Sequence, residues 1–282
     1  IYLPGVTLPS AIEVTTDKLR IVEADAMLCV IPTQHIRAQL PDFREALTNR
    51  QMPVALCSKG IERASGKTVH QMVEEIWPEA GIAVLSGPSF AADVAARLPT
   101  AVTLADQNQA RGEVWTRTLA TPAFRPYWSS DVIGAELGGA IKNVLAIACG
   151  MSKGAALGQS AKAALMARGF AETLRFATAM GARAETLNGL SGLGDIILTC
   201  SSTQSRNYSL GVEIGKGRKA RDILAERKTV AEGAATAPVL TRLAAGLGVD
   251  MPICSAVETV LNENVPVLDV VQRLLERPLR SE

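Results

Sequence analysis

The sequence has few of the residues from which metal centres and disulfide frameworks are built. It contains only two histidines, His35 and His70, and five cysteines that lie far apart along the chain. Neither a C-x-x-C spacing nor an H-E-x-x-H pair occurs, and those patterns are the usual signs of zinc and redox sites. We therefore expect no metal, and we expect the cysteines to be buried, reduced thiols in a cytoplasmic protein.

A charge excess of one sign is also absent, as are long hydrophobic runs. The 29 Lys and Arg residues balance 28 Asp and Glu residues, for a formal net charge of +1. So balanced a chain does not favour nucleic acid or an anionic membrane as a partner. Apolar runs such as residues 27–31 and 144–148 fall far short of the roughly 20 residues that span a bilayer. Nothing at the start resembles a signal peptide. The sequence thus predicts no membrane span and, at most, a small anionic ligand.

The first 130 residues alternate short apolar runs with stretches of helical periodicity. At 282 residues, 48% of them hydrophobic, the chain is long enough for about two domains. Apolar residues three and four apart predict a helix over 68–77. The predicted strands are 26–31, 53–57, 82–85, 101–104 and 124–128. Continuous apolar strands separated by helices predict a mostly parallel sheet that is covered on both faces.

Beyond Asp131 the strand signal ends. Asp131 is a candidate N-cap, and Ile133, Leu137, Ile141 and Val144 form an apolar stripe at helical spacing. Further helices are predicted at 160–180, 220–226, 234–247, 253–261 and 267–275. We expect an α/β domain over residues 1–130 and an all-helical domain over residues 131–282.

The dinucleotide fingerprint G-x-G-x-x-G is not found after any predicted strand. The nearest match, Gly215 to Ala220, lies deep in the helical half with no strand before it. We interpret it as a turn between helices. A fingerprint would have to precede Ile1.

Two predicted strands end in residues that suit an anion. Ser86-Gly-Pro-Ser-Phe90 follows one strand and precedes a short helix, and Lys59-Gly60 follows another. Parallel strands end at one edge of the sheet, where helix N-termini and backbone N–H groups favour anions. Ser89 would add a hydroxyl and Lys59 an ammonium. The alternatives are an ordinary turn and a solvated lysine.

In the helical half, Lys142 shares one stripe of a predicted helix with Gly134 and Gly138. Small residues there let another backbone or a ligand approach the ammonium. If the ammonium is partly desolvated, its pKa falls and it can exchange a proton near neutral pH. The alternative is a lysine that extends over a close helix crossing with its charge in water.

A later segment offers a carboxylate and a phosphate-binding group. Asp195 and Thr199 share a helix face at i and i+4, and Asp195 either takes part in a site or caps its helix. Ser205, Arg206 and Asn207 follow. An Arg fork beside a hydroxyl and an amide suits a phosphate, whereas the alternative is an exposed Arg in a polar loop.

Taken in order, these motifs resemble those of bacterial NAD(P)-dependent sn-glycerol-3-phosphate dehydrogenases over essentially the whole chain. The most specific are Lys-Asn-Val at 142–144 and Gly-Asp at 194–195 with Ser-Arg-Asn at 205–207. The other matching segments are 24–31, Ser-Lys-Gly at 58–60, Ser-Gly-Pro-Ser-Phe-Ala at 86–91, 136–150, 192–200 and Val-Ala-Glu-Gly at 230–233.

The resemblance implies a Rossmann-type cofactor domain followed by an all-α substrate domain, in a homodimer. The implied reaction reduces dihydroxyacetone phosphate to sn-glycerol 3-phosphate with NADH or NADPH, for phospholipid synthesis. Lys142 would exchange a proton with the C2 oxygen, Asp195 would orient Lys142, and Lys59 would lie near cofactor and substrate. The implied substrate contacts are Lys59, Gly87, Ser89, Lys142, Asp195, Ser205, Arg206 and Asn207, and the implied cofactor contacts are Lys59, Ala91, Arg206, Val230 and Glu232.

Members of this family begin with a strand, a Gly-rich turn and a second strand, all of which precede the segment that corresponds to residues 1–5. We expect these strands before Ile1 in the full-length protein, because a parallel sheet without them would expose a long apolar edge. Two other functions fit the sequence: a related dehydrogenase for another small 2-hydroxy compound, and an inactive binding protein with the same fold.

Overall fold

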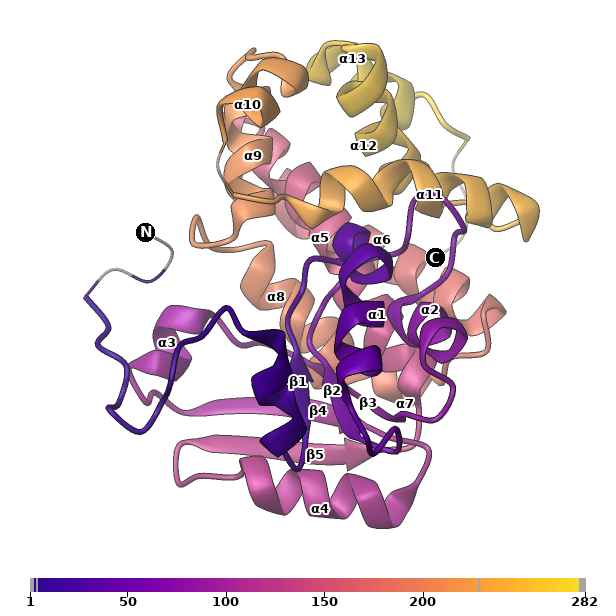
Figure 1. Ribbon diagram of the computed structural model, residues 1–282. Coiled ribbons are helices and arrows are strands. Elements are labelled where there is room, and N and C mark those ends of the chain that lie inside the picture. Colours follow the sequence, from indigo (N-terminus) through magenta and orange to yellow (C-terminus); the bar gives the residue numbers. More distant parts are fainter. Residues whose placement is uncertain (1–2, 4, 228, 279–282) are drawn as a thin grey trace.

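Five strands form one sheet, which lies below a group of helices in the view of Figure 1. The computed structural model describes residues 3, 5–227 and 229–278. The strand order is β1-β2-β3-β4-β5, and every neighbouring pair is parallel except β3 with β4. The strands are β1 (Met27–Cys29), β2 (Pro53–Leu56), β3 (Gly81–Ser86), β4 (Thr100–Ala105) and β5 (Phe124–Ser129). Each predicted strand is confirmed, and β1 lies at one edge with Leu28 half exposed.

Helices cover both faces of this sheet. On one face, α1 (Ile36–Ala46), α2 (Val69–Ile76) and the start of α5 (Val132–Gly154) share an apolar cluster with β1, β2 and β3. On the other face, Trp115 of α4 (Gln109–Leu119) packs against the sheet. The sequence analysis predicts α2 but neither α1 nor α4, because Pro41 interrupts the pattern of α1 and α4 buries only Gly112 and Trp115.

The long helix α5 is the core of the second half. Asp131 caps it as predicted, because its Oδ1 accepts a hydrogen bond from the Gly134 N–H at 2.9 Å. Of its 23 residues, 20 are buried. Among the described residues, α5 alone has the length and hydropathy to cross a membrane, but 94% of the 18-residue apolar window within it is buried inside the protein. Its hydrophobicity is therefore that of a core helix.

Other helices surround α5 (Figure 1). They are α6 (Gly158–Ala179), α7 (Ala184–Asn188), α8 (Asp195–Thr199), α9 (Arg206–Gly215), α10 (Ala220–Glu226), α11 (Glu232–Gly246), α12 (Pro252–Glu263) and α13 (Val267–Leu275). A π-helical turn, η3 (Leu190–Gly194), leads into α8, α3 (Ala91–Ala95) follows β3, and the 3-10 helices η1 (Lys18–Glu23) and η2 (Thr33–His35) flank β1. The predicted Rossmann-type domain followed by helices is confirmed.

Two smaller expectations are settled by this arrangement. Gly215 to Ala220 joins α9 to α10, so it is a turn between helices as predicted. The alternative for Arg206, an exposed Arg in a polar loop, is right about its exposure and wrong about the loop: Arg206 begins α9, which Ser205 caps, because the Ser205 Oγ accepts a hydrogen bond from the Tyr208 N–H at 3.2 Å. The five cysteines are free thiols, and four of them are buried as expected, but Cys57 is only partly buried.

α5 and α9 cross so closely that only glycine fits at the contact. A Cβ added to Gly150 would lie 2.1 Å from the Tyr208 carbonyl oxygen, and one added to Gly211 would lie 2.1 Å from that of Ile147. Any side chain would push the two backbones apart. This crossing holds the first turn of α9 beside the middle of α5, where Asn207 reaches Asn143.

Candidate active site

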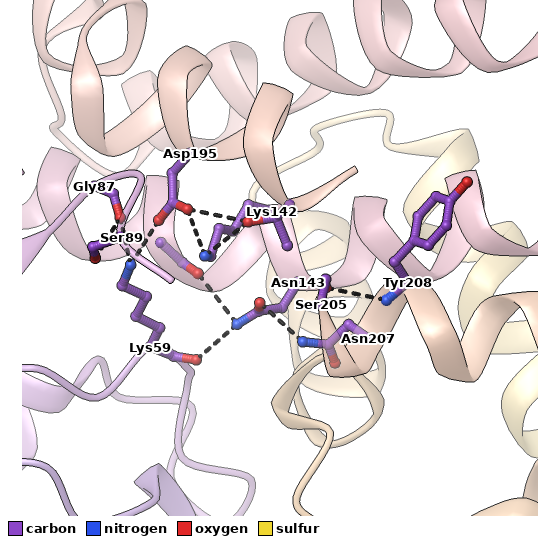
Figure 2. Close-up of polar contacts among 11 residues, drawn as sticks. Lys59, Gly87, Ser89, Lys142, Asn143, Asp195, Ser205, Asn207 and Tyr208 are labelled. Carbon is purple, nitrogen blue, oxygen red and sulfur yellow. Dashed lines mark hydrogen bonds and ion pairs between the residues drawn. The ribbon is translucent and has the colours of Figure 1, made fainter. Parts of the chain in front are cut away.

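Three polar side chains of the helical half meet in its interior at Lys142 (Figure 2). The Lys142 Nζ donates hydrogen bonds to Asp195 Oδ1 at 2.6 Å and to Thr199 Oγ1 at 3.0 Å. Thr199 Oγ1 in turn donates to the same Asp195 oxygen at 3.1 Å. Lys142 is 8% exposed and Asp195 1% exposed. The alternatives of a lysine with its charge in water and of a capping aspartate are therefore excluded.

A glycine and a π-helical turn bring Asp195 to Lys142. A Cβ on Gly138 would lie 2.3 Å from the Ser191 carbonyl oxygen, so α5 and η3 touch through their backbones. η3 leads directly into α8, whose first residue is Asp195. Inserted π-turns often re-aim a side chain at a functional site. Gly134 of the predicted stripe lies instead at the capped end of α5, against Asp131.

Lys59 reaches the same carboxylate from the α/β half. Its Nζ donates to Asp195 Oδ2 at 2.7 Å and to the Gly87 carbonyl oxygen at 3.0 Å. The Lys59 side chain is 20% exposed, so it is not the freely solvated lysine of the alternative reading. The prediction that β2 and β3 end at one edge is confirmed, because Lys59 and Gly87 are in contact there.

The charged side chains of this cluster shift the pKa values of Lys142 and Asp195. Burial, followed by the positive charge of Lys59, lowers the pKa of Lys142 to about 8, although Asp195 opposes the shift. Burial alone would raise the pKa of Asp195, but the two lysines outweigh it and hold that pKa below its ordinary value. Asp195 therefore stays ionised while Lys142 is able to exchange a proton near neutral pH.

The turn after β3 needs its glycine. Gly87 has a φ of +140°, and a Cβ there would lie 3.0 Å from the Val102 Cα, so both the backbone conformation and the space require glycine. Ser89 Oγ donates to the Gly87 carbonyl oxygen at 3.2 Å. A hydroxyl and an ammonium thus converge on this turn, where an anionic ligand can meet both.

A row of amide contacts joins three elements beside the lysines (Figure 2). Asn143 Nδ2 donates to the Lys59 carbonyl oxygen at 3.2 Å. Asn207 Nδ2 donates to Asn143 Oδ1 at 3.0 Å, and the Gly233 N–H donates to Asn207 Oδ1 at 3.0 Å. We call the segment between β2 and α2, residues 57–68, the Lys59 loop. The row connects the Lys59 loop through α5 and α9 to the first turn of α11, so these segments hold one another in place.

A second group of polar atoms surrounds Glu232 at the ends of β1 and β2. The Thr33 N–H donates to Glu232 Oε1 at 3.0 Å, and burial raises the Glu232 pKa. Among the described residues, Glu232 Oε2 and Thr33 Oγ1 are buried without a partner. A Cβ on Gly60 would lie 2.8 Å from Thr33 Oγ1 and 3.2 Å from Glu232 Oε2. Unpaired polar atoms at this edge fit the polar groups of a bound dinucleotide.

The remaining predicted residues lie around these two groups. Ser205 is buried at the start of α9. The next residue, Arg206, is exposed, and its charge is close enough to Glu232 to oppose part of the rise that burial causes in the pKa of that carboxyl. Ala91 begins α3, and Val230 precedes α11; both are exposed. The hydrogen bonds of the cluster around Lys142 therefore do not involve the exposed side chains of Ala91, Arg206 and Val230 in the part of the chain that the structure describes.

Two members of the cluster have no role in the sequence analysis, namely Asn143 and Thr199. The sequence analysis places Thr199 on one helix face with Asp195 by its i+4 spacing, but it assigns Thr199 no function. Asn143 directly follows Lys142, so the two side chains point in different directions from α5. Besides the Gly139 carbonyl of its own helix, the partners of Asn143 come from the crossing with α9 and from the loop that carries Lys59.

The strand ends converge on a buried lysine–carboxylate cluster, beside unpaired polar atoms at the sheet edge where Rossmann folds bind dinucleotides. These features define a two-domain oxidoreductase of the Rossmann type. Residues 1–112 and 131–272 match the N-terminal and C-terminal parts of the family described as NAD-dependent glycerol-3-phosphate dehydrogenase. The chain belongs to this family.

Individual relatives agree with the family match. The chain is 53% identical over 282 residues to glycerol-3-phosphate dehydrogenase (NAD(P)+) of Erythrobacter litoralis, covering 100% of this chain and 84% of that protein. It is 52% identical over 281 residues to the Hyphomonas neptunium enzyme of the same name, covering 100% and 83%. The crystal structure of glycerol-3-phosphate dehydrogenase from Coxiella burnetii superposes with a TM-score of 0.92 at 35% identity, covering 98% of this chain and 84% of that one. The resemblance and the dependence on NAD(P) are thereby confirmed.

Proposed function

We propose that this protein reduces dihydroxyacetone phosphate to sn-glycerol 3-phosphate with NADH or NADPH, and so supplies glycerophospholipid synthesis. The observation that carries the proposal is the buried Lys142 ammonium, which is held by Asp195 and Thr199 and has a pKa of about 8. A carbonyl reduction needs such a group, because the oxygen gains negative charge and then a proton.

Lys142 is the proposed proton donor to the C2 oxygen of the substrate, through its Nζ. Asp195 keeps that ammonium aimed, and its own charge is held by both lysines, so it does not compete for the proton. Thr199 accepts a second hydrogen bond from the Lys142 ammonium and so restricts its orientation further. The nicotinamide of the cofactor, when bound, supplies the hydride.

The phosphate of the substrate is proposed to lie between the Gly87 turn and the start of α9. Gly87, Ser89 and Lys59 border it from the α/β half. From the helical half, Ser205, Arg206 and Asn207 form the N-terminal turn of the ten-residue helix α9, whose free N–H groups favour an anion. Phosphate binding far from the reacting carbon fixes that carbon for reduction.

The cofactor is proposed to lie along the ends of β1 and β2. Glu232, with its unpaired oxygen, and Lys59 border this edge directly. Arg206, whose charge faces Glu232, lies at its rim. Ala91 and Val230 complete the proposed set from the exposed segments on either side.

We further propose that the chain divides into a cofactor domain, residues 1–130, and a catalytic domain, residues 131–282. β5 ends at Ser129 and α5 begins at Val132, so the division falls between the last strand and the central helix. We also propose that the protein is a cytoplasmic homodimer. Its proposed ligand besides the cofactor is a small phosphorylated substrate.

The decisive experiment adds dihydroxyacetone phosphate to the purified full-length protein, with the segment expected before Ile1 included, in the presence of NADH or NADPH. We expect the absorbance of the reduced nicotinamide to fall and sn-glycerol 3-phosphate to accumulate. Unphosphorylated dihydroxyacetone serves as the matched control, because it keeps the carbonyl and lacks the phosphate. Equal turnover of the two would favour a dehydrogenase for another small 2-hydroxy compound, and no turnover of either would favour a binding protein.

A further inference from the structure

The loop that carries Lys59 is attached to α5 at both of its ends. At the first end, Asn143 donates to the Lys59 carbonyl oxygen at 3.2 Å. Beside it, a Cβ on Gly139 would lie 3.3 Å from Lys59 Cγ and Cδ, so the aliphatic part of Lys59 rests on the helix backbone. The second attachment lies where the loop enters α2, and the proposed mechanism does not use it.

This second attachment is a buried pair, His70 and Glu136. The His70 N–H donates to Glu136 Oε1 at 2.7 Å, and its ring Nδ1 contacts Glu136 Oε2. Thr68 Oγ1 lies 2.9 Å from the same ring nitrogen. His70 is 6% exposed and Glu136 5% exposed. In the described part of the chain, every hydrogen bond to the Glu136 carboxylate comes from His70. The visible function of this carboxylate is therefore to connect α5 of the helical half to α2 of the α/β half.

The two attachments lie on one stripe of α5. Glu136, Gly139 and Asn143 are spaced by three and four residues, which puts them on a single helix face. Lys142 is on the neighbouring face, toward Asp195. One rigid helix therefore sets the position of the Lys59 loop relative to the Lys142 ammonium.

The loop itself is stiff enough to transmit this restraint. Ile61 and Thr68 form an antiparallel bridge, and inside it the Glu62 N–H donates to the Lys67 carbonyl oxygen at 2.9 Å. Arg37 Nε donates to Glu62 Oε1 at 2.7 Å and ties the bridge to α1. These contacts connect the end of the loop at His70 to the end at Gly60 and Lys59.

We propose that His70 and Glu136 are positioning residues for the reaction: they seat the Lys59 loop on α5, so that the Lys59 ammonium reaches Asp195 and the Gly87 carbonyl. Removing either partner leaves a buried polar group unpaired, and such a group draws in water or moves toward it. The loop then leaves α5, and Lys59 loses its place beside Lys142. The kinetic part of the following test rests on the proposed function.

His70→Ala tests the pair, and His70→Asn is the conservative variant, because the Asn amide nitrogen can donate near the position of Nδ1. We expect His70→Ala to lower kcat/KM for dihydroxyacetone phosphate about tenfold or more, since a misplacement of about 1 Å in a site costs up to about a hundredfold. His70→Asn should recover most of the loss. Arg44→Ala is the matched control, because it removes an ion pair of the same half, to Glu79, away from the Lys59 loop.

A double-mutant cycle shows whether the effect passes through Lys59. In a Lys59→Ala background, His70→Ala should lower kcat/KM by less than about twofold more, because coupled residues are not additive. A loss as large as in the wild-type background would overturn the proposal. Glu136→Gln keeps the shape of the pair and should show a smaller loss in the same direction, which covers the case in which His70→Ala does not fold.

A second readout needs no enzymatic activity. The rate at which an amine-acylating ester modifies Lys59, followed by mass spectrometry of the folded variants, should rise at least threefold in His70→Ala, with His70→Asn and Arg44→Ala like the wild type. An unchanged Lys59 rate in His70→Ala and Glu136→Gln would refute the positioning role. If the wild type fails to reduce dihydroxyacetone phosphate, the proposed function fails, and this labelling still decides the inference.

Discussion

The two halves of the molecule supply the same kind of group to the site in different ways. The α/β half presents Lys59 from a loop, whereas the helical half presents Lys142 from the middle of its central helix. The Lys142 side chain is 10% exposed and the Lys59 side chain 20%, and both bind Asp195. A lysine fixed in a packed helix loses more solvation, so it is suited to exchange a proton, while the lysine on the loop is suited to hold a charged ligand.

Replacing each lysine in turn is the strongest way to break this comparison. We expect Lys142→Ala to lower kcat by about a thousandfold or more, since it removes the proposed proton donor and, with it, the charge proposed to stabilise the developing oxyanion. Cofactor affinity should stay within about twofold by fluorescence titration. Lys59→Ala should act more on KM. Near-normal turnover of Lys142→Ala would remove it from the mechanism.

The pH dependence of the rate tests whether Lys142, and not Lys59, exchanges the proton. In the proposed mechanism, reduction requires Lys142 in its protonated form, so the rate of reduction should fall as pH rises through the lowered pKa of about 8. The reverse oxidation requires the free amine and should rise through the same range. If the residual activity of Lys142→Ala depended on pH in the same way as the wild-type activity, this assignment would be contradicted.

The close helix packing of the second half predicts the next largest effect. Gly211→Ala places a methyl group 2.1 Å from the Ile147 carbonyl oxygen. We expect it to lower the free energy of unfolding by about 3 kcal/mol, the upper end for overpacking, because backbone is less able to yield than a side chain. Gly246→Ala is the matched control, since nothing lies within 4 Å of a Cβ there. Equal denaturation midpoints for the two would show that the crossing is looser than described.

A buried carboxyl should make the stability of the helical half depend on pH. Glu172 accepts the N–H groups of Ile253 and Cys254 at 2.8 and 3.2 Å, and burial raises its pKa to about 7. Because this pKa lies above the unfolded value of about 4.3, the folded state binds the proton more tightly, and its stability falls as pH rises from about 4 to 7. Glu172→Gln should remove this dependence. Between pH 4 and pH 8 the variant should therefore keep at most about 3 kcal/mol of the free energy of unfolding that the wild type loses. Urea titrations at both pH values measure it, and a variant that keeps the wild-type slope would exclude Glu172 as its source.

The smallest expected effect concerns the rim of the site. Arg206→Ala should weaken substrate or cofactor binding about tenfold with little change in kcat, because an exposed guanidinium contributes through charge-assisted contacts to a bound anion. Arg221→Ala, an exposed arginine of α10 paired only with its neighbour Asp222 among the described residues, is the control. Unchanged affinities for both ligands would place Arg206 outside the site.

Local patterns were enough to predict the strands, α2, most helices of the second half and the Asp131 cap, because periodicity and capping are properties of neighbouring residues. α1 and α4 escaped this approach, since one contains Pro41 and the other buries little apolar surface. Lys142 and Asp195 could be proposed as a pair only from the family resemblance. Spacing alone left each with an ordinary structural alternative.

The amino-acid sequence by itself determined the family, the order of the elements and the identity of the site lysines, since these depend on motifs that stand close together in the chain. The tertiary structure decided which groups meet: Lys59 with Asp195, Asn143 with Asn207, and His70 with Glu136, at separations of 136, 64 and 66 residues. No local pattern encodes such contacts, because they arise only when strand ends and helices are packed against one another. Burial, which lowers the pKa of Lys142, is likewise a property of that packing.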